Sequence, residues 1–249
     1  MSYTKFSKLH HQNDLLLLGN VWDAQSAKIA ESTGFKALGS SSHAIANSLG
    51  YADGEQMSVD ELLFIVERIV KSVKIPVSVD FESGYSDDPD QVAKYVKQLV
   101  ELGVAGINLE DGKVVKSKRT LGKATLLSDK IAAIKALTKN IFINARTDTY
   151  TTKHETALEE TLKRAQIYDQ AGADGFFVPL AETKVDIEKI VNSTRLPLNL
   201  FLTDKLPKAA VLTEIGVKRL SHGAKIYEYL VAENTKLFHD FLIHPKLPK

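Results

Sequence analysis

Two acidic residues stand at the end of an apolar stretch in the segment IPVSVDFESGYSDDPD (residues 75–90). Side chains alternate between the two faces of a β-strand, so Asp80 and Glu82 are predicted to share one face. Carboxylates that are crowded in this way either share a proton or surround a cation. Ligand sets made only of oxygen suit Mg²⁺ or Mn²⁺. The pair is therefore a candidate metal site.

Two later segments add charged residues of the same kind. The apolar run 104–111 carries Glu110, and the run 141–148 carries Arg146. If these runs are neighbouring strands, three carboxylates and one guanidinium meet at one edge. Each residue taken singly is explained as well by a solvated rim or a structural ion pair. Four of them at the ends of three consecutive strands favour a functional site.

The predicted elements that position these residues alternate in a regular pattern. Short apolar runs alternate with longer amphipathic segments, which predicts βα units and a parallel sheet. Eight such units in 249 residues favour a closed (β/α)8 barrel, and we expect one domain over residues 1–249. Its active site would lie where the strands end. The predicted strands are 14–20, 35–42, 75–82, 104–111, 141–148, 174–181, 196–202 and 217–223.

Helix ends are also marked in the sequence. Ser58 followed by Glu61 predicts a capping box at a helix start. Glycine often follows the last residue of a helix, and four glycines are predicted to do so. They are Gly34, Gly103, Gly172 and Gly216.

Composition excludes several classes of protein. Lys plus Arg is 32 and Asp plus Glu is 31, so no net charge favours nucleic acid or an anionic membrane. No apolar run approaches the roughly 18 residues of a membrane span. The absence of cysteine excludes disulfides, thiolate metal ligands and a cysteine nucleophile, and it fits a reducing compartment. We expect a cytoplasmic protein.

Three motifs together resemble the isocitrate lyase/phosphoenolpyruvate mutase superfamily. They are GSSSHAIANSLGYADGE (39–55), VDFESGYSDDPDQVAKYVKQLVELGVAGINLEDG (79–112) and NARTD (144–148). The resemblance, which is to phosphonomutase-like proteins among others, implies a (β/α)8 barrel that binds Mg²⁺. It also implies cleavage or formation of C–C or C–P bonds in small α-keto or hydroxy carboxylates through enolate-like intermediates.

The resemblance assigns roles residue by residue. Asp80, Glu82 and Glu110 match metal carboxylates of the superfamily, with Glu82 at a position where many members have Asp. Asp53 matches an acid that approaches the metal and the reacting group, and Arg146 matches an arginine that grips an acid group of the substrate. The remaining substrate contacts implied by the resemblance are Ser40, Ser41, Ser42 and Asn199.

Departures from the superfamily pattern narrow the expected reaction. Isocitrate and methylisocitrate lyases carry a loop cysteine that handles a proton, whereas the corresponding segment here, 110–129, has none. Segment 110–129 does not match the loop of the mutases either. A further departure is Leu180, which follows Pro179 at a position where the lyases have Glu. We therefore expect a smaller keto acid, with oxaloacetate decarboxylation as an example, because a Lewis-acid metal can stabilise the enolate.

Alternatives remain open at this stage. One is a class II-type pyruvate aldolase, and another is a barrel that binds a keto acid without turnover. Members of the superfamily often exchange a C-terminal helix, so a homodimer or homotetramer is expected. The basic run 113–123 predicts either a lid over an anionic substrate or a solvated loop.

Five other positions draw attention. Trp22 is predicted to line the mouth or pack in the core. His43 is either a polar contact in the active site or a solvated loop residue. His222 is expected to reach the mouth or to cap the last helix. His10 and His11 are predicted to belong to a mobile terminus.

Overall fold

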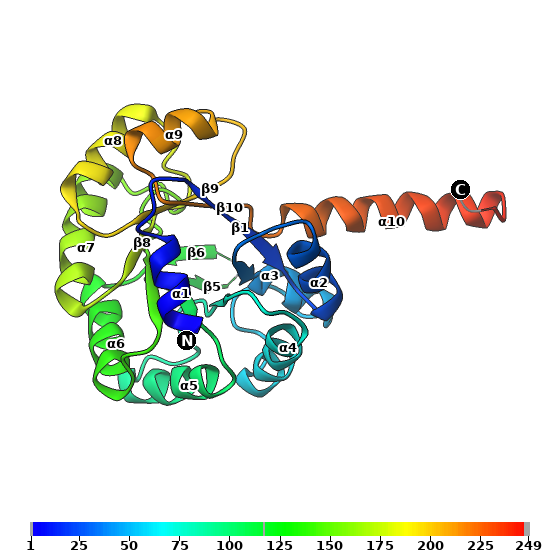
Figure 1. Cartoon of the computed structure of the whole chain (residues 1–249), viewed down its shortest axis with the longest axis horizontal. Helices are drawn as coiled ribbons and strands as arrows, with labels where there is room; N and C mark the ends of the chain where they lie inside the picture. Colours follow the sequence, from blue (N-terminus) through cyan, green and yellow to red (C-terminus); the bar gives the residue numbers. More distant parts are fainter. Residues whose placement is uncertain (1, 117, 247–249) are drawn as a thin grey trace.

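The computed structural model describes residues 2–116 and 118–246. Eight parallel strands form a closed barrel, with β1 paired to β10 to complete the ring (Figure 1). The predicted fold class is therefore confirmed, and each of the eight predicted runs overlaps a barrel strand. In order around the barrel, the strands are β1 (Leu16–Val21), β2 (Leu38–Ser40), β3 (Val77–Asp80), β4 (Gly106–Glu110), β7 (Phe142–Arg146), β8 (Gly175–Phe177), β9 (Leu198–Phe201) and β10 (Arg219–Ser221).

Helices follow most of the strands and surround the barrel (Figure 1). The main hydrophobic core lies between this ring of helices and the outer faces of the strands, and it includes Val79, Ile107 and Ile143. The helices are α2 (Ala24–Ser32), α3 (Ser42–Ser48), α4 (Val59–Ser72), α5 (Pro89–Glu101), α6 (Ala124–Leu137), α7 (Ala157–Ala171), α8 (Lys184–Ser193) and α9 (Ala209–Ile215).

Helix α4 shows how local sequence fixes an element. The Ser58 side chain accepts from the backbone N–H of Glu61, while the Glu61 carboxylate accepts from the backbone N–H of Ser58, so the predicted capping box is confirmed. Leu62, Val66 and Ile69 are spaced for one helical face and are all buried. The four predicted glycines all have positive φ, as expected after a helix.

The N-terminal helix closes the bottom of the barrel. Helix α1 (Ser2–Leu9) places Phe6 against Phe142 and against Gly106, at which a Cβ atom would come within 2.7 Å of the ring. His10 is buried, its Nδ1 lies 2.8 Å from the carbonyl oxygen of Phe6, and its ring stacks on Phe142. The prediction of a mobile terminus at His10 was therefore wrong: aromatic packing that the local sequence does not reveal holds it.

The basic run 113–123 forms an antiparallel hairpin rather than an open loop. Strand β5 (Gly112–Val115) pairs with β6 (Lys118–Leu121) outside the barrel, and Ser117 lies outside the described residues. The hairpin follows β4 directly. It therefore stands beside the end of the barrel at which the strands terminate.

The last helix, α10 (Lys225–Ile243), extends away from the barrel (Figure 1). None of its residues is buried, and Phe238 and Leu242 are 77% and 85% exposed. No helix in the described part of the chain is both long and apolar enough to cross a membrane.

Candidate active site

A cavity of about 400 Å³ lies where the barrel strands end. Its walls come from the loops after β2, β3 and β4, from the hairpin, and from the start of α10. The charged residues that line it are His43, Asp53, Asp80, Glu82, Glu110, Arg119, Arg146, Lys225 and Glu228. The structure thus brings all of the predicted metal carboxylates, Asp53 and Arg146 to one cavity.

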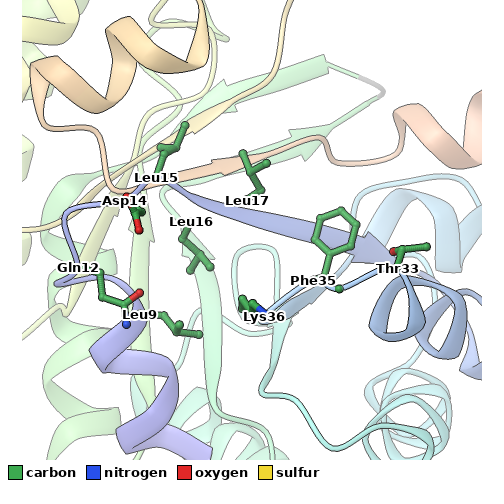
Figure 2. Close-up of a pocket in the computed structure, with 10 residues that line it drawn as sticks. Leu9, Gln12, Asp14, Leu15, Leu16, Leu17, Thr33, Phe35 and Lys36 are labelled. Atoms are coloured by element: carbon green, nitrogen blue, oxygen red, sulfur yellow. The ribbon is translucent and has the colours of Figure 1, made fainter.

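A second cavity, of about 420 Å³, lies at the beginning of β1 (Figure 2). Leu9, Leu15 and Phe35 are among its lining residues, and its only charged residues are Asp14 and Lys36. It therefore offers no group of acids comparable to that at the other end of the barrel.

Asp80 is held at the end of β3 by hydrogen bonds. Its Oδ2 accepts from the Ser42 hydroxyl at 2.8 Å, and its Oδ1 accepts from the Asn108 amide at 3.4 Å. Its backbone N–H donates to the Ser40 hydroxyl at 2.9 Å. These contacts fix the orientation of a carboxylate that forms no ion pair within the described residues, so its charge is left for a cation.

Glu82 reaches the cavity by a route that strand alternation did not predict. Strand β3 ends at Asp80, and Glu82 adopts the left-handed region with φ of 48°. Backbone strain of this kind is costly for a residue other than glycine and often marks functional sites. Burial, together with the nearby Asp53 and Asp80 charges, raises the pKa of Glu82 to about 9. The close spacing of these acids therefore costs electrostatic free energy.

We call Asp53, Asp80 and Glu82 the acidic side of the cavity. Asp53 Oδ1 is buried and finds no hydrogen-bond partner in the part of the chain that the structure describes, and Asp53 Oδ2 lies 3.8 Å from His43 Nδ1. Carboxylate oxygens suit Mg²⁺, the ion that the resemblance of the sequence implies. Among the described residues, no three acidic or histidine side chains converge closely enough to hold an ion by themselves. An ion here would keep several waters, as Mg²⁺ commonly does.

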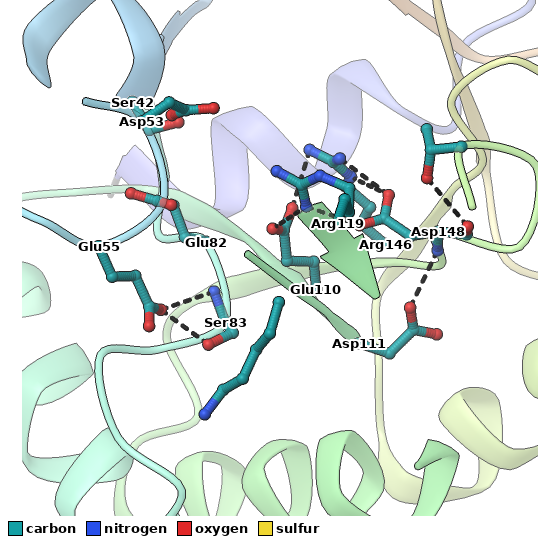
Figure 3. A network of polar contacts seen from close by, with 12 residues as sticks. Ser42, Asp53, Glu55, Glu82, Ser83, Glu110, Asp111, Arg119, Arg146 and Asp148 are labelled. Carbon is teal, nitrogen blue, oxygen red and sulfur yellow. Dashed lines mark hydrogen bonds and ion pairs between the residues drawn. The ribbon is translucent and has the colours of Figure 1, made fainter. Parts of the chain in front are cut away.

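The opposite wall consists of ion pairs. We call its four residues, Glu110, Asp148, Arg119 and Arg146, the paired side (Figure 3). Arg146 Nη1 lies 2.8 Å from Glu110, and its Nε and Nη2 donate to Asp148. Arg119 contacts the same two acids from β6. Burial raises the pKa of Glu110, and Arg146 opposes that effect. Two acids and two guanidiniums leave this wall close to neutral.

A buried residue behind the paired side holds it in place. Asp111 Oδ1 accepts from the backbone N–H of Asp148, and its Oδ2 accepts from Arg164 at 2.8 Å and from the Tyr168 hydroxyl at 2.6 Å. Each oxygen of this carboxylate is therefore bonded, which makes Asp111 a support for the Asp148 loop.

The predicted serine residues have different surroundings. Ser42 binds Asp80, whereas Ser41 caps α3 by accepting from the backbone N–H of Ala44. The backbone N–H of Ser41 donates to Val21 within the sheet. Ser40 and Asn199 are buried within the barrel and are not among the residues that line the cavity.

Two of the histidines are separated by the fold. His43 lines the cavity and lies 3.8 Å from both Asp53 and Glu228. His222 instead joins β10 to β1, since its Nε2 accepts from the backbone N–H of Asn20. Trp22 packs edge-on against Tyr227 and lines a separate, mainly apolar cavity.

Sequence reasoning missed Arg119, Asp148, Phe201, Lys225 and Glu228 at or beside the site. Asp148 could have been found, because the alternation that selected Arg146 also selects the residue two positions later. Arg119 lies in the basic run, but nothing in the local sequence distinguishes it from the neighbouring lysines.

Comparison with known proteins places this barrel and its charged mouth in a family. Residues 6–242 match the family described as phosphoenolpyruvate phosphomutase, and the chain belongs to that family. The phosphoenolpyruvate mutase/isocitrate lyase superfamily consists of Mg²⁺-dependent lyases and mutases.

Individual relatives cover most of the chain. It is 37% identical over 222 residues to a protein of Mycobacterium tuberculosis strain H37Rv, covering 89% of this chain and 83% of that one. It is 27% identical over 228 residues to 2-methylisocitrate lyase of Halalkalibacterium halodurans, covering 90% and 74%. A Burkholderia cenocepacia structure described as a phosphonomutase has a TM-score of 0.86 and 37% identity, covering 94% and 96%.

Proposed function

We propose that this protein is a Mg²⁺-dependent lyase- or mutase-type enzyme for a small α-keto or dicarboxylic acid. Cleavage of a C–C or C–P bond would proceed through an enolate, with oxaloacetate decarboxylation as the reaction to test first. The observation that carries the proposal is one cavity with two acids on one wall, Asp80 and Glu82, that form no ion pair within the described residues, and paired guanidiniums on the other wall.

The acidic side would hold the ion, chiefly through Asp80. Glu82, and Glu110 from the paired side, would contribute partly through waters. The bound ion would act as a Lewis acid toward the keto oxygen of the substrate. Ser42 keeps the Asp80 carboxylate in position through its hydroxyl. Ser40 supports the Asp80 backbone. Ser41 and Asn199 remain candidates for contacts with the substrate.

Asp53 and Arg146 would handle the proton and the second acid group. Asp53 Oδ1 is buried and has no hydrogen-bond partner among the described residues, so it can accept or return a proton at the carbon that loses its bond. Arg146 provides positive charge for an acid group of the substrate, and Asp148 and Glu110 fix its guanidinium. Charge placed in advance where it develops in the transition state is a large contribution to catalysis.

Isocitrate and methylisocitrate lyase activities are not part of the proposal. The chain has no cysteine to supply the loop proton, although a relative named 2-methylisocitrate lyase is 27% identical. We expect no release of glyoxylate or pyruvate from isocitrate or methylisocitrate. Robust turnover would show that another group, such as His43 or a hairpin lysine, replaces the thiol.

The direct test is keto-acid loss from oxaloacetate with purified protein and Mg²⁺, compared with the same mixture without protein. Pyruvate plus an aldehyde tests the class II-type aldolase in parallel. If the protein binds the keto acid but turns over neither mixture, it is a binding protein and the enzymatic proposal is contradicted.

We also propose that the chain forms a homodimer or homotetramer through α10. The support is the exposure of its apolar side chains, including Phe238 and Leu242, along a helix that extends from the barrel. Light scattering on the wild type and on a Phe238→Ser/Leu242→Ser variant tests this. A monomeric wild type would contradict it.

A further inference from the structure

Two guanidiniums on the paired side share the same two carboxylates, but they use their donors differently. Arg146 uses all three nitrogens: Nε and Nη2 donate to Asp148 Oδ1 at 2.9 and 2.8 Å, and Nη1 forms an ion pair with Glu110 Oε2 at 2.8 Å. Its planar edges are therefore occupied by the protein's own acids.

Arg119 makes both of its contacts through one nitrogen. Its Nη1 lies 2.5 Å from Glu110 Oε1 and 2.7 Å from Asp148 Oδ2. The Nε–Nη2 edge of Arg119 has no hydrogen-bond partner among residues 2–116 and 118–246. This is the edge that matches a carboxylate with two parallel hydrogen bonds.

The unused edge belongs to a side chain at the cavity. Arg119 lines the same cavity as Asp80 and is 23% exposed, compared with 15% for Arg146. Glu110 and Asp148 raise the pKa of Arg119 further, against the effect of its burial, so it stays charged. A ligand carboxylate could therefore reach it without displacing a protein contact.

The hairpin that carries Arg119 is fixed to two loops of the rim. Lys113 Nζ lies 2.5 Å from Asp87, in the loop after β3. Val114 packs so closely on Gly54, next to Asp53, that a Cβ atom there would come within 2.7 Å of it. These contacts place the guanidinium relative to the acidic side.

We propose that Arg119 makes the direct hydrogen bonds to the second carboxylate of the substrate, toward which Arg146 supplies positive charge, and thereby selects dicarboxylates over monocarboxylates. This rests on the proposed function, in which the ion on the acidic side binds the keto oxygen and the second acid group lies beside Arg146. Without a cation, Asp53 and Asp80 repel a dianion, so the selection by Arg119 requires Mg²⁺.

Malate and lactate test the proposal, because they share the 2-hydroxy acid and differ in the second carboxylate. Calorimetry with Mg²⁺ should show malate binding to the wild type about 10-fold or more tightly than lactate, which is the scale of a charge-assisted hydrogen bond. Arg119→Gln should remove that preference by weakening malate alone.

Arg119→Lys keeps a charge near Glu110 and lacks the planar edge, so it should also lose most of the preference. It keeps the proposal testable if the Gln variant fails to fold. Lys118→Gln, an exposed neighbour on the same hairpin, is the matched control and should bind both acids as the wild type does.

The outcomes distinguish the role of Arg119 from the proposed function. Equal weakening of malate and lactate by both Arg119 variants, or no change in either acid, overturns the role of Arg119 while leaving the proposed function in place. If the wild type binds neither these acids nor oxaloacetate with Mg²⁺, the proposed function falls and this inference falls with it.

Discussion

The two walls of the cavity differ in how their closely spaced charges are stabilised. On the paired side, Glu110 and Asp148 are matched by Arg119 and Arg146. On the acidic side, Asp80 and Glu82 form no ion pair within the described residues, and Glu82 has a pKa raised to about 9. The difference supports the proposal that one wall is complete as folded, whereas the other would be stabilised by a bound cation.

The largest effect is expected on the acidic side. Asp80→Ala should abolish measurable Mg²⁺ binding and lower activity by more than about 100-fold, the upper range for residues that only support a metal ligand. The barrel should survive, because Asp80 lies at a strand end and contributes mainly hydrogen bonds. Titration calorimetry and circular dichroism measure the two properties.

The matched control is Glu101→Ala, an exposed acid on α5, which should bind Mg²⁺ normally. Unchanged Mg²⁺ affinity in Asp80→Ala would remove Asp80 from the metal site and leave the acidic side without a function.

Arg146→Lys should show how far the paired side serves the substrate. The lysine keeps one positive charge and loses the planar fork that contacts Asp148 and Glu110. We expect keto-acid binding weaker by about 1–3 kcal/mol, a lower melting temperature, and Mg²⁺ affinity that changes little. Calorimetry and thermal melting on the same preparation test this, and a destabilised variant with normal acid binding would restrict Arg146 to a structural role.

Glu82→Gln should act in opposite directions with and without metal. Unfolded Glu82 ionises near pH 4.5 and folded Glu82 near pH 9. The folded state therefore holds an extra proton between these values, and the free energy of unfolding of the metal-free protein falls as the pH rises. The neutral amide avoids this loss.

The metal-free Glu82→Gln variant should melt a few degrees above the wild type at pH 8, since about 1 kcal/mol corresponds to about 2–4 °C in a domain of this size. The gain should shrink at pH 5, and saturating Mg²⁺ should reverse it by stabilising only the wild type strongly. Equal melting temperatures of the two metal-free proteins at pH 8 would show that Glu82 carries no electrostatic cost.

The smallest effect is expected behind the paired side. Tyr168→Phe removes the hydroxyl that donates to Asp111 at 2.6 Å and leaves Arg164 on the same carboxylate oxygen. Chemical denaturation should show a loss of about 1 kcal/mol, with unchanged Mg²⁺ affinity. A large loss of Mg²⁺ binding would mean that the two walls are coupled more tightly than their contacts suggest.

The sequence by itself determined that the chain forms a barrel and at which end of the barrel the site lies. Hydrophobic runs, the Ser58–Glu61 capping box and the glycines at helix ends are local signals, since each depends on residues close together in the chain. Alternation along the strands was enough to place Asp80, Glu110 and Arg146 at one mouth, where the structure has them.

Only the tertiary structure decided how the charges are shared. Glu82 enters the cavity through a left-handed backbone beyond the end of β3, and Arg119 arrives on a hairpin that the sequence showed only as a basic run. His10 is held by Phe6 and Phe142, and His222 by Asn20, which is 202 positions away in the chain. Pairing, burial and pKa depend on distances between segments far apart in the chain, and local patterns do not contain those distances.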